Sequence, residues 1–103
     1  MPFSISVSTQ DVTATVSLIG ELDAAGAPLF HDAVEKAAAS GVTHLALRAH
    51  DLTYMASAGL RSLVFARQKM GDHVRITVAG ASPTVARTIR QAGFDRSVTL
   101  VDA

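Results

Sequence analysis

The sequence has no cysteine, no net charge and no long apolar run, and each absence excludes a class of protein. Without cysteine the chain forms no disulfide, no thiolate metal site and no thiol nucleophile. Nine basic residues balance nine acidic ones, so no overall field favours nucleic acid, anionic lipid or a strongly charged substrate. No stretch approaches the roughly 20 apolar residues that span a bilayer, and Met1-Pro2-Phe3-Ser4 has no basic segment followed by an apolar one. We therefore expect a cytoplasmic protein with no membrane span.

The length and the apolar content are those of one small domain. The chain has 103 residues, of which 49% are hydrophobic, enough for one compact core and too few for two ordinary domains. We expect a single domain over residues 1–103. The four histidines have no short metal-ligand spacing, so we expect no metal site and no cofactor.

Apolar and polar residues alternate twice near the N-terminus, over residues 3–8 and 12–18. This alternation predicts two strands that pair as a hairpin. The period then becomes helical, with Pro28 suited to the first turn of a helix and Gly41 to its end. Residues 42–47 follow at once and predict a central strand, which a right-handed crossover brings into a parallel arrangement.

The second half of the chain repeats the alternation of helix and strand. The predicted elements are a helix over residues 57–70, a strand over 74–78, a helix that begins at Ser82-Pro83 and a strand over 98–101. The order is ββαβαβαβ, which predicts an α/β domain with a mixed sheet and helices packed on at least one face.

One stretch, Asp51-Leu52-Thr53-Tyr54-Met55-Ala56-Ser57-Ala58-Gly59-Leu60-Arg61, connects a predicted strand to a predicted helix. Gly20-Glu21-Leu22-Asp23 follows the second strand, and Ser82-Pro83 precedes the last helix. In this order and at these separations the three segments resemble the STAS-domain anti-anti-sigma factors, also called anti-sigma factor antagonists. The resemblance extends over nearly the whole chain and implies a STAS-like fold.

The resemblance also implies a function. Ser57 matches the serine that is phosphorylated by an anti-sigma factor that is itself a serine kinase. In that scheme the unphosphorylated protein binds the kinase and frees its sigma factor, and phosphorylation releases the kinase again. A serine/threonine phosphatase of the metal-dependent class resets the switch. The protein would then be a substrate and a binding module with no catalysis of its own.

Elementary chemistry supports Ser57 independently of the resemblance. A serine just before an amphipathic helix is a natural N-cap, so we expect its hydroxyl at the surface, accepting from a backbone N–H of the first turn. Its small neighbours Ala56, Ala58 and Gly59 leave the approach of a kinase unobstructed. The N-terminus of a helix also tolerates a phosphate, because N–H groups and the helix dipole favour an anion there.

The expected partner-binding residues lie around Ser57: Asp23, Ala56, Ala58, Gly59, Leu60, Arg61 and Phe65. Helical spacing places Phe65 nearly opposite an apolar face that includes Leu63 and Val64, so we expect it to be exposed and available as an interface anchor. Glu21 and Asp51 are further candidates for acidic neighbours of Ser57.

Two alternatives stay open. Ala56 stands where many family members carry aspartate, which leaves room for an adaptor of a transport or stress-sensing complex in which Ser57 is not phosphorylated. The other alternative is a small enzyme with Ser57 as nucleophile, which would need a histidine and a carboxylate within hydrogen-bond reach. His50 is the nearest histidine in sequence.

Overall fold

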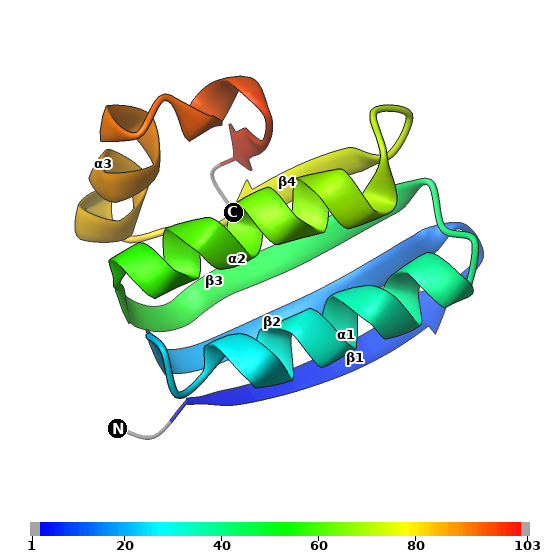
Figure 1. Ribbon diagram of the computed structural model, residues 1–103, viewed down its shortest axis with the longest axis horizontal. Coiled ribbons are helices and arrows are strands. Elements are labelled where there is room, and N and C mark those ends of the chain that lie inside the picture. The colour runs from blue at the N-terminus through cyan, green and yellow to red at the C-terminus, as the bar shows by residue number, and fades with distance from the viewer. Residues whose placement is uncertain (1–2, 102–103) are drawn as a thin grey trace.

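The computed structural model describes residues 3–101 and shows a five-stranded sheet with helices α1 and α2 side by side on one face (Figure 1). The four terminal residues of the predicted 1–103 domain lie outside the described residues. The elements are β1 (Ser4–Gln10), β2 (Thr13–Leu22), α1 (Ala27–Ala39), β3 (His44–Met55), α2 (Ser57–Met70), β4 (Arg75–Ala79), α3 (Pro83–Gln91), the 3₁₀ helix η1 (Phe94–Arg96) and β5 (Thr99–Val101). The predicted α/β order ββαβαβαβ is confirmed, and η1 is the one addition to it within the described residues.

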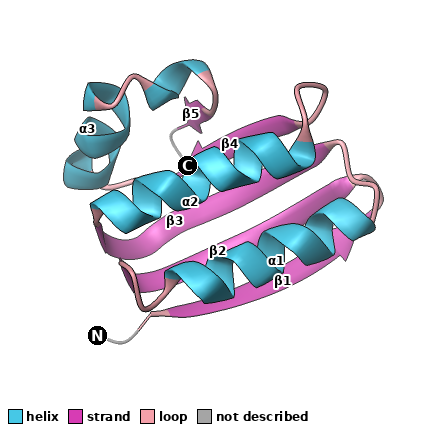
Figure 2. Ribbon diagram, in the orientation of Figure 1, coloured by secondary structure: helices cyan, strands magenta, loops and turns pink. Residues whose placement is uncertain are grey.

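The sheet is mixed, as predicted. The strands follow one another in space as β1-β2-β3-β4-β5, with β3 in the centre (Figure 2). The first two strands pair antiparallel as a hairpin, in which Asp11 has a φ of 55°. The pairs β2–β3, β3–β4 and β4–β5 are parallel, because a helical connection precedes each of these later strands.

The alternation in the sequence separates the two faces of the sheet. Ala14, Val16 and Leu18 of β2 are at most 2% exposed and pack beneath the helices. Their polar neighbours Thr15 and Ser17 are half-buried and point to the opposite side, because successive side chains of a strand alternate. We call this opposite side the open face of the sheet.

The signals for the helix ends are confirmed. Pro28 lies in the first turn of α1, and Gly41 follows its end with a φ of +70°. Ser82 caps α3, with its Oγ accepting from the Val85 N–H at 3.2 Å. Gly71 ends α2 with a φ of +85°, where a residue with a Cβ would be strained.

Two strands continue beyond their predicted ends. The parallel pairing of β2 with β3 extends through two register shifts as far as Leu22 opposite Met55. Backbone pairing therefore maintains both strands after the apolar alternation has become irregular. These extended ends carry the connections into α1 and α2, and so they position the candidate site.

Candidate functional site

Ser57 lies where the longest strand passes directly into a helix. The Ala56 N–H donates to the Leu22 carbonyl oxygen at 3.0 Å, which joins the ends of β2 and β3. Ser57 is the next residue, the first of α2, and it is exposed. The prediction that its hydroxyl lies at the surface is confirmed.

The prediction that Ser57 caps the helix is wrong. Ala56 is the N-cap, and its carbonyl oxygen accepts from the N–H groups of Gly59 and Leu60 at 2.9 and 3.2 Å. The helix begins one residue earlier than a capping Ser57 would require, because Ala56 is already tied to Leu22. No side chain caps α2, and within residues 3–101 the Ser57 hydroxyl makes no hydrogen bond. It is therefore available to an incoming group.

The surroundings of Ser57 favour an anion. The first N–H groups of a helix have no intrahelical partner, and the helix dipole adds a partial positive charge there. The first turn of α2 contains no acidic residue. Arg61 is exposed one turn further along, on the same side of the helix as Ser57. The helix itself can thus accept a phosphate on Ser57.

Gly59 allows α2 to rest on the ends of the strands. It is buried, and a Cβ built on it would come within 2.6 Å of Met55 Cγ and 2.9 Å of the Leu22 carbonyl oxygen. Any larger residue would push the first turn of α2 away from the sheet. The structure gives Gly59 a packing role, while the neighbouring Ala58 and Leu60 are half-buried.

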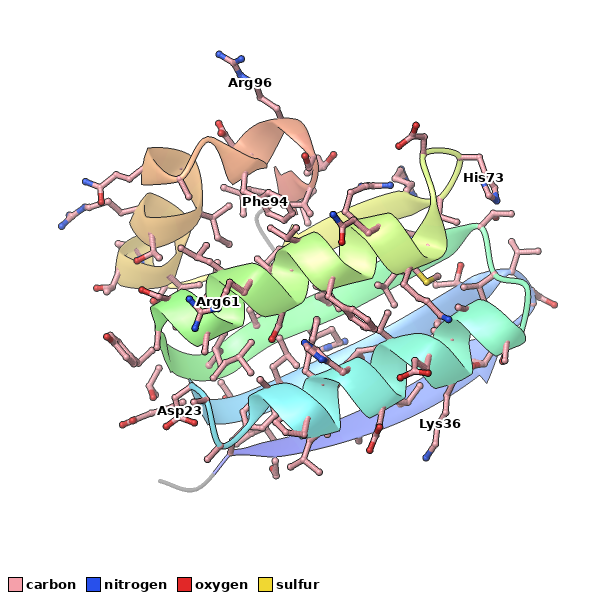
Figure 3. The ribbon with its side chains drawn as sticks, viewed as in Figure 1. Asp23, Lys36, Arg61, His73, Phe94 and Arg96 are labelled. Carbon is pink, nitrogen blue, oxygen red and sulfur yellow. The ribbon has the colours of Figure 1, made fainter. Side chains whose placement is uncertain are left out.

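Two of the expected acidic residues lie at the same end of the sheet as Ser57. Glu21 is exposed and pairs with Tyr54. The Asp23 carboxylate oxygen Oδ1 accepts from the N–H groups of Ala25 and Gly26 at 3.1 and 3.2 Å, which fixes the loop before α1. Figure 3 shows Asp23 and Arg61 at this shared end.

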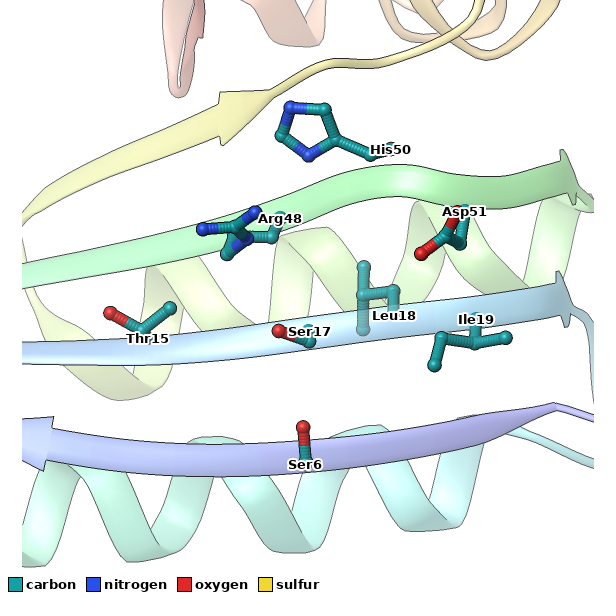
Figure 4. Close-up of a pocket in the computed structure, with 8 residues that line it drawn as sticks. All are labelled: Ser6, Thr15, Ser17, Leu18, Ile19, Arg48, His50 and Asp51. Atoms are coloured by element: carbon teal, nitrogen blue, oxygen red, sulfur yellow. The ribbon is translucent and has the colours of Figure 1, made fainter. Parts of the chain in front are cut away.

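The third acidic candidate, Asp51, does not join them, because β3 continues to Met55. Asp51 is inside the strand and pairs with Ile19. Its side chain lines a polar pocket of about 420 Å³ together with Arg48 and His50, on the open face of the sheet (Figure 4). The prediction that Asp51 neighbours Ser57 is wrong.

The orientation of α2 differs from the prediction. Phe65 is half-buried and stacks on the His31 ring, with ring centroids 4.2 Å apart, whereas Val64 is 41% exposed. The reason is that α1 packs along α2. Because of this packing, α2 buries a face made mostly of small residues. The buried residues of α2 are Gly59, Ser62, Leu63, Ala66 and Met70. The prediction that Phe65 is exposed is therefore wrong.

Val64 and Tyr54 were missed as candidate contact residues. Val64 lies on the exposed stripe of α2 with Ser57 and Arg61, at intervals of four and three residues. Tyr54 is 49% exposed at the end of β3, three residues before Ser57. The small residues Gly59, Ser62 and Ala66 recur at intervals of three and four along α2 and form its buried face. This helical spacing is the sequence signal that could have identified Val64 as exposed.

A buried hydrogen-bond chain connects α1 to the first turn of α2. Ser62 is fully buried, and its hydroxyl donates to the Ala58 carbonyl oxygen at 3.0 Å. A serine has one hydroxyl proton, so its oxygen must accept from His31 Nε2–H, 3.1 Å away. This fixes the tautomer of His31 and ties α1 to the turn that follows Ser57.

The arrangement that a serine nucleophile requires is not present around Ser57 in residues 3–101. His50 lies against Gly80, so closely that a Cβ there would overlap its ring, and it makes no hydrogen bond to Ser57. Within the same residues no group of three or more metal-ligating side chains could hold an ion. Every helix that the structure describes is too short or too polar to cross a bilayer.

Together, the layered sheet and the exposed serine at the start of α2 describe a small α/β domain with an accessible hydroxyl where strand passes into helix. A family model described as "Mlab, STAS domain" matches residues 5–102. The chain therefore belongs to the STAS domain family, and the resemblance in the sequence is confirmed.

Individual relatives agree with this assignment. The anti-sigma-F factor antagonist RsfB of Mycobacterium tuberculosis is 28% identical over 96% of this chain and 83% of its own length. The crystal structure of an anti-sigma factor antagonist from Mycobacterium paratuberculosis superposes with a TM-score of 0.86 at 25% identity, over 96% of this chain and 85% of that one. The phosphorylated form of the Bacillus cell fate determinant SpoIIAA superposes with a TM-score of 0.75 at 21% identity, over 99% and 91%.

Proposed function

We propose that the protein is an anti-sigma factor antagonist in a partner-switching pathway and that phosphorylation of Ser57 controls it. The observation that carries the proposal is the position of Ser57, exposed at the first residue of α2 with its hydroxyl unengaged within residues 3–101. The names of the relatives support the class of function. The phosphorylated SpoIIAA structure supports the view that this fold accommodates a phosphate.

In the unphosphorylated state the exposed stripe of α2 binds the anti-sigma factor, which is also the kinase. Tyr54 and Val64 supply exposed apolar surface, and tyrosine and arginine are among the residues that most often anchor an interface. Arg61 supplies a charge beside them. Asp23, Ala56, Ala58, Gly59 and Leu60 shape the same end of the molecule, and Phe65 acts from beneath by supporting the helix.

Phosphorylation releases the partner without unfolding the protein. A phosphate adds about −1.5 to −2 charges, which the N-terminus of α2 tolerates. An interface shaped for a neutral hydroxyl does not tolerate the phosphate, because the phosphate must be desolvated there and is repelled by carboxylates of the partner. Glu21 and Asp23 increase the negative charge at this end. A metal-dependent serine/threonine phosphatase then restores the hydroxyl, and the whole cycle takes place in the cytoplasm.

The direct test is to incubate the purified protein with ATP and the kinase encoded nearest to it, and to locate the phosphate by peptide mass spectrometry. We expect one phosphate, on Ser57. Ser57→Ala should abolish incorporation, whereas Ser40→Ala, which changes another exposed serine of a helix end, should leave it unchanged. Incorporation at a different residue would contradict the assignment of Ser57.

Ala56 supports one second candidate, an adaptor subunit of a transport or stress-sensing complex without obligatory phosphorylation. The N-cap position beside Ser57 holds Ala56, where many family members carry aspartate. Tight binding to the partner without any transfer of phosphate would favour this adaptor role over the switch.

A further inference from the structure

The strand β1 forms an edge of the sheet and lacks the features that normally protect an edge. It spans seven residues, SISVSTQ, with no charge and no proline. It pairs with β2 from Ser4–Ile19 to Gln10–Thr13 without a register shift, so no bulge twists it away. Edge strands in natural proteins are usually short or carry charges, prolines or bulges that prevent pairing with another chain. An edge strand without these features can pair with a further strand. The opposite edge, β5, has only three residues.

A groove runs beside this edge, between β1 and α1. Its volume is about 440 Å³, and its apolar lining includes Ile5, Val7 and Leu29. Val7 is 37% exposed and Leu29 is 47% exposed. Asp32 and Lys36, one helical turn apart on α1, line the same groove. Figure 3 shows Lys36 extending past the β1 edge.

These features match a second copy of the same chain. An antiparallel pairing about a two-fold axis through Val7 sets Val7 opposite itself and Ile5 opposite Thr9, on the side of the helices. The same pairing sets Ser6 opposite Ser8 on the open face. Backbone hydrogen bonds then extend across the axis, and Val7 and the two serines each pair with a residue of their own kind.

The charges of α1 agree with this symmetry. α1 runs in the same direction as β1 (Figure 1), so the two-fold axis reverses it in the second copy. Asp32 of each copy then faces Lys36 of the second copy, giving two opposite-charge pairs. A parallel pairing would need a two-fold axis along the strands, which would place the two α1 helices on opposite faces of the joined sheet, so these charges would not meet.

We propose that the protein forms a homodimer by antiparallel β1–β1 pairing, which makes one continuous sheet of both copies. The axis reverses the strand direction, and Ser57 lies at the carboxyl end of β3. The two Ser57 residues therefore lie at opposite ends of the joined sheet, and each remains accessible. The dimer does not depend on the proposed function, because its surface is separate from the start of α2.

Sedimentation equilibrium of the full chain over micromolar to millimolar concentrations tests this proposal. The mass should rise from 10.7 kDa toward twice that value. Val7→Lys sets like charges opposite each other and should weaken association roughly tenfold or more. Val101→Lys is the matched control, since Val101 is also 37% exposed but lies on the other edge. A monomer throughout, or disruption by Val101→Lys alone, would overturn the proposal.

Two further variants test the register. Lys36→Asp should weaken the dimer, and adding Asp32→Lys in the same chain should restore it by exchanging the charges. Because the chain has no cysteine, Val7→Cys introduces a single thiol at the axis, where mild oxidation should give a covalent dimer. Val101→Cys should not cross-link. A wild-type dimer whose Val7→Cys variant stays uncross-linked would show that another surface is used.

Discussion

The imidazole ring of His31 on α1 stacks on the phenyl ring of Phe65 on α2, with ring centroids 4.2 Å apart and planes inclined by 21°. The same imidazole donates from Nε2 to the buried Ser62 hydroxyl. One side chain thus joins the two helices by an aromatic contact and a hydrogen bond. Both helices begin at the end of the sheet where Ser57 lies, so this junction also fixes the candidate site.

His31→Ala should lower the free energy of unfolding by about 1–2 kcal/mol, because it removes the stack and leaves the Ser62 oxygen without its donor. Urea denaturation followed by circular dichroism measures the change. His73→Ala is the control, since His73 is exposed in the loop before β4, and it should change stability by no more than about 0.5 kcal/mol. Equal effects of the two substitutions would contradict the assigned role of His31.

Ser57 and Ser82 should respond differently to the same substitution. The Ser82 hydroxyl accepts from the Val85 N–H, so Ser82→Ala should cost about 1 kcal/mol of stability. The Ser57 hydroxyl caps nothing, and Ser57→Ala should therefore be nearly neutral. Thermal and urea unfolding of both variants measure the difference. A loss of stability in Ser57→Ala as large as in Ser82→Ala would show that Ser57 does cap α2 in solution.

Ala56 occupies the N-cap of α2 with extended backbone, φ −81° and ψ 175°, and offers no side-chain acceptor. Aspartate in this conformation accepts from a first-turn N–H and interacts favourably with the helix dipole. Ala56→Asp should therefore stabilise the protein by about 0.5–2 kcal/mol. The same variant can be compared with the wild type in the rate of phosphorylation. An unchanged or lower unfolding free energy would contradict the N-cap assignment.

Stability should decrease in mild acid because of His44. Burial lowers the pKa of His44 below its ordinary value of 6.5, and the charge of Arg75 lowers it further. A group with a depressed folded-state pKa contributes stability that is fully present above pH 6.5 and is lost as the pH falls through the folded-state pKa. Urea unfolding at about pH 7.5 and about pH 5 measures the loss. His44→Gln should reduce this pH dependence, and an identical dependence in both proteins would exclude His44 as its source.

Local signals predicted most of the fold. Strand alternation, Pro28, Gly41 and Ser82 each act within a few residues, and the structure confirms the elements that they indicate. The continuation of β3 to Met55 could not be predicted in this way, because it depends on pairing with β2.

The position of Ser57 was predictable, but the surface around it was less so. The rotation of α2 depends on α1 packing against it, which buries small residues such as Ser62 and leaves Val64 outside. A hydrophobicity pattern gives little weight to small residues such as Ser62, so it oriented α2 by Leu63 and Val64 and reversed the roles of Val64 and Phe65. The cap was misassigned because the Ala56–Leu22 hydrogen bond is a long-range contact.

The most direct test of the central claim is the affinity of the partner kinase for unphosphorylated and Ser57-phosphorylated protein, measured by isothermal titration calorimetry. Circular dichroism of both forms checks that the fold is unchanged. We expect the two forms to fold alike and the phosphorylated form to bind roughly 100-fold more weakly, because the phosphate must be desolvated in an interface shaped for a hydroxyl. Equal affinities, with phosphate confirmed on Ser57, would contradict the switch.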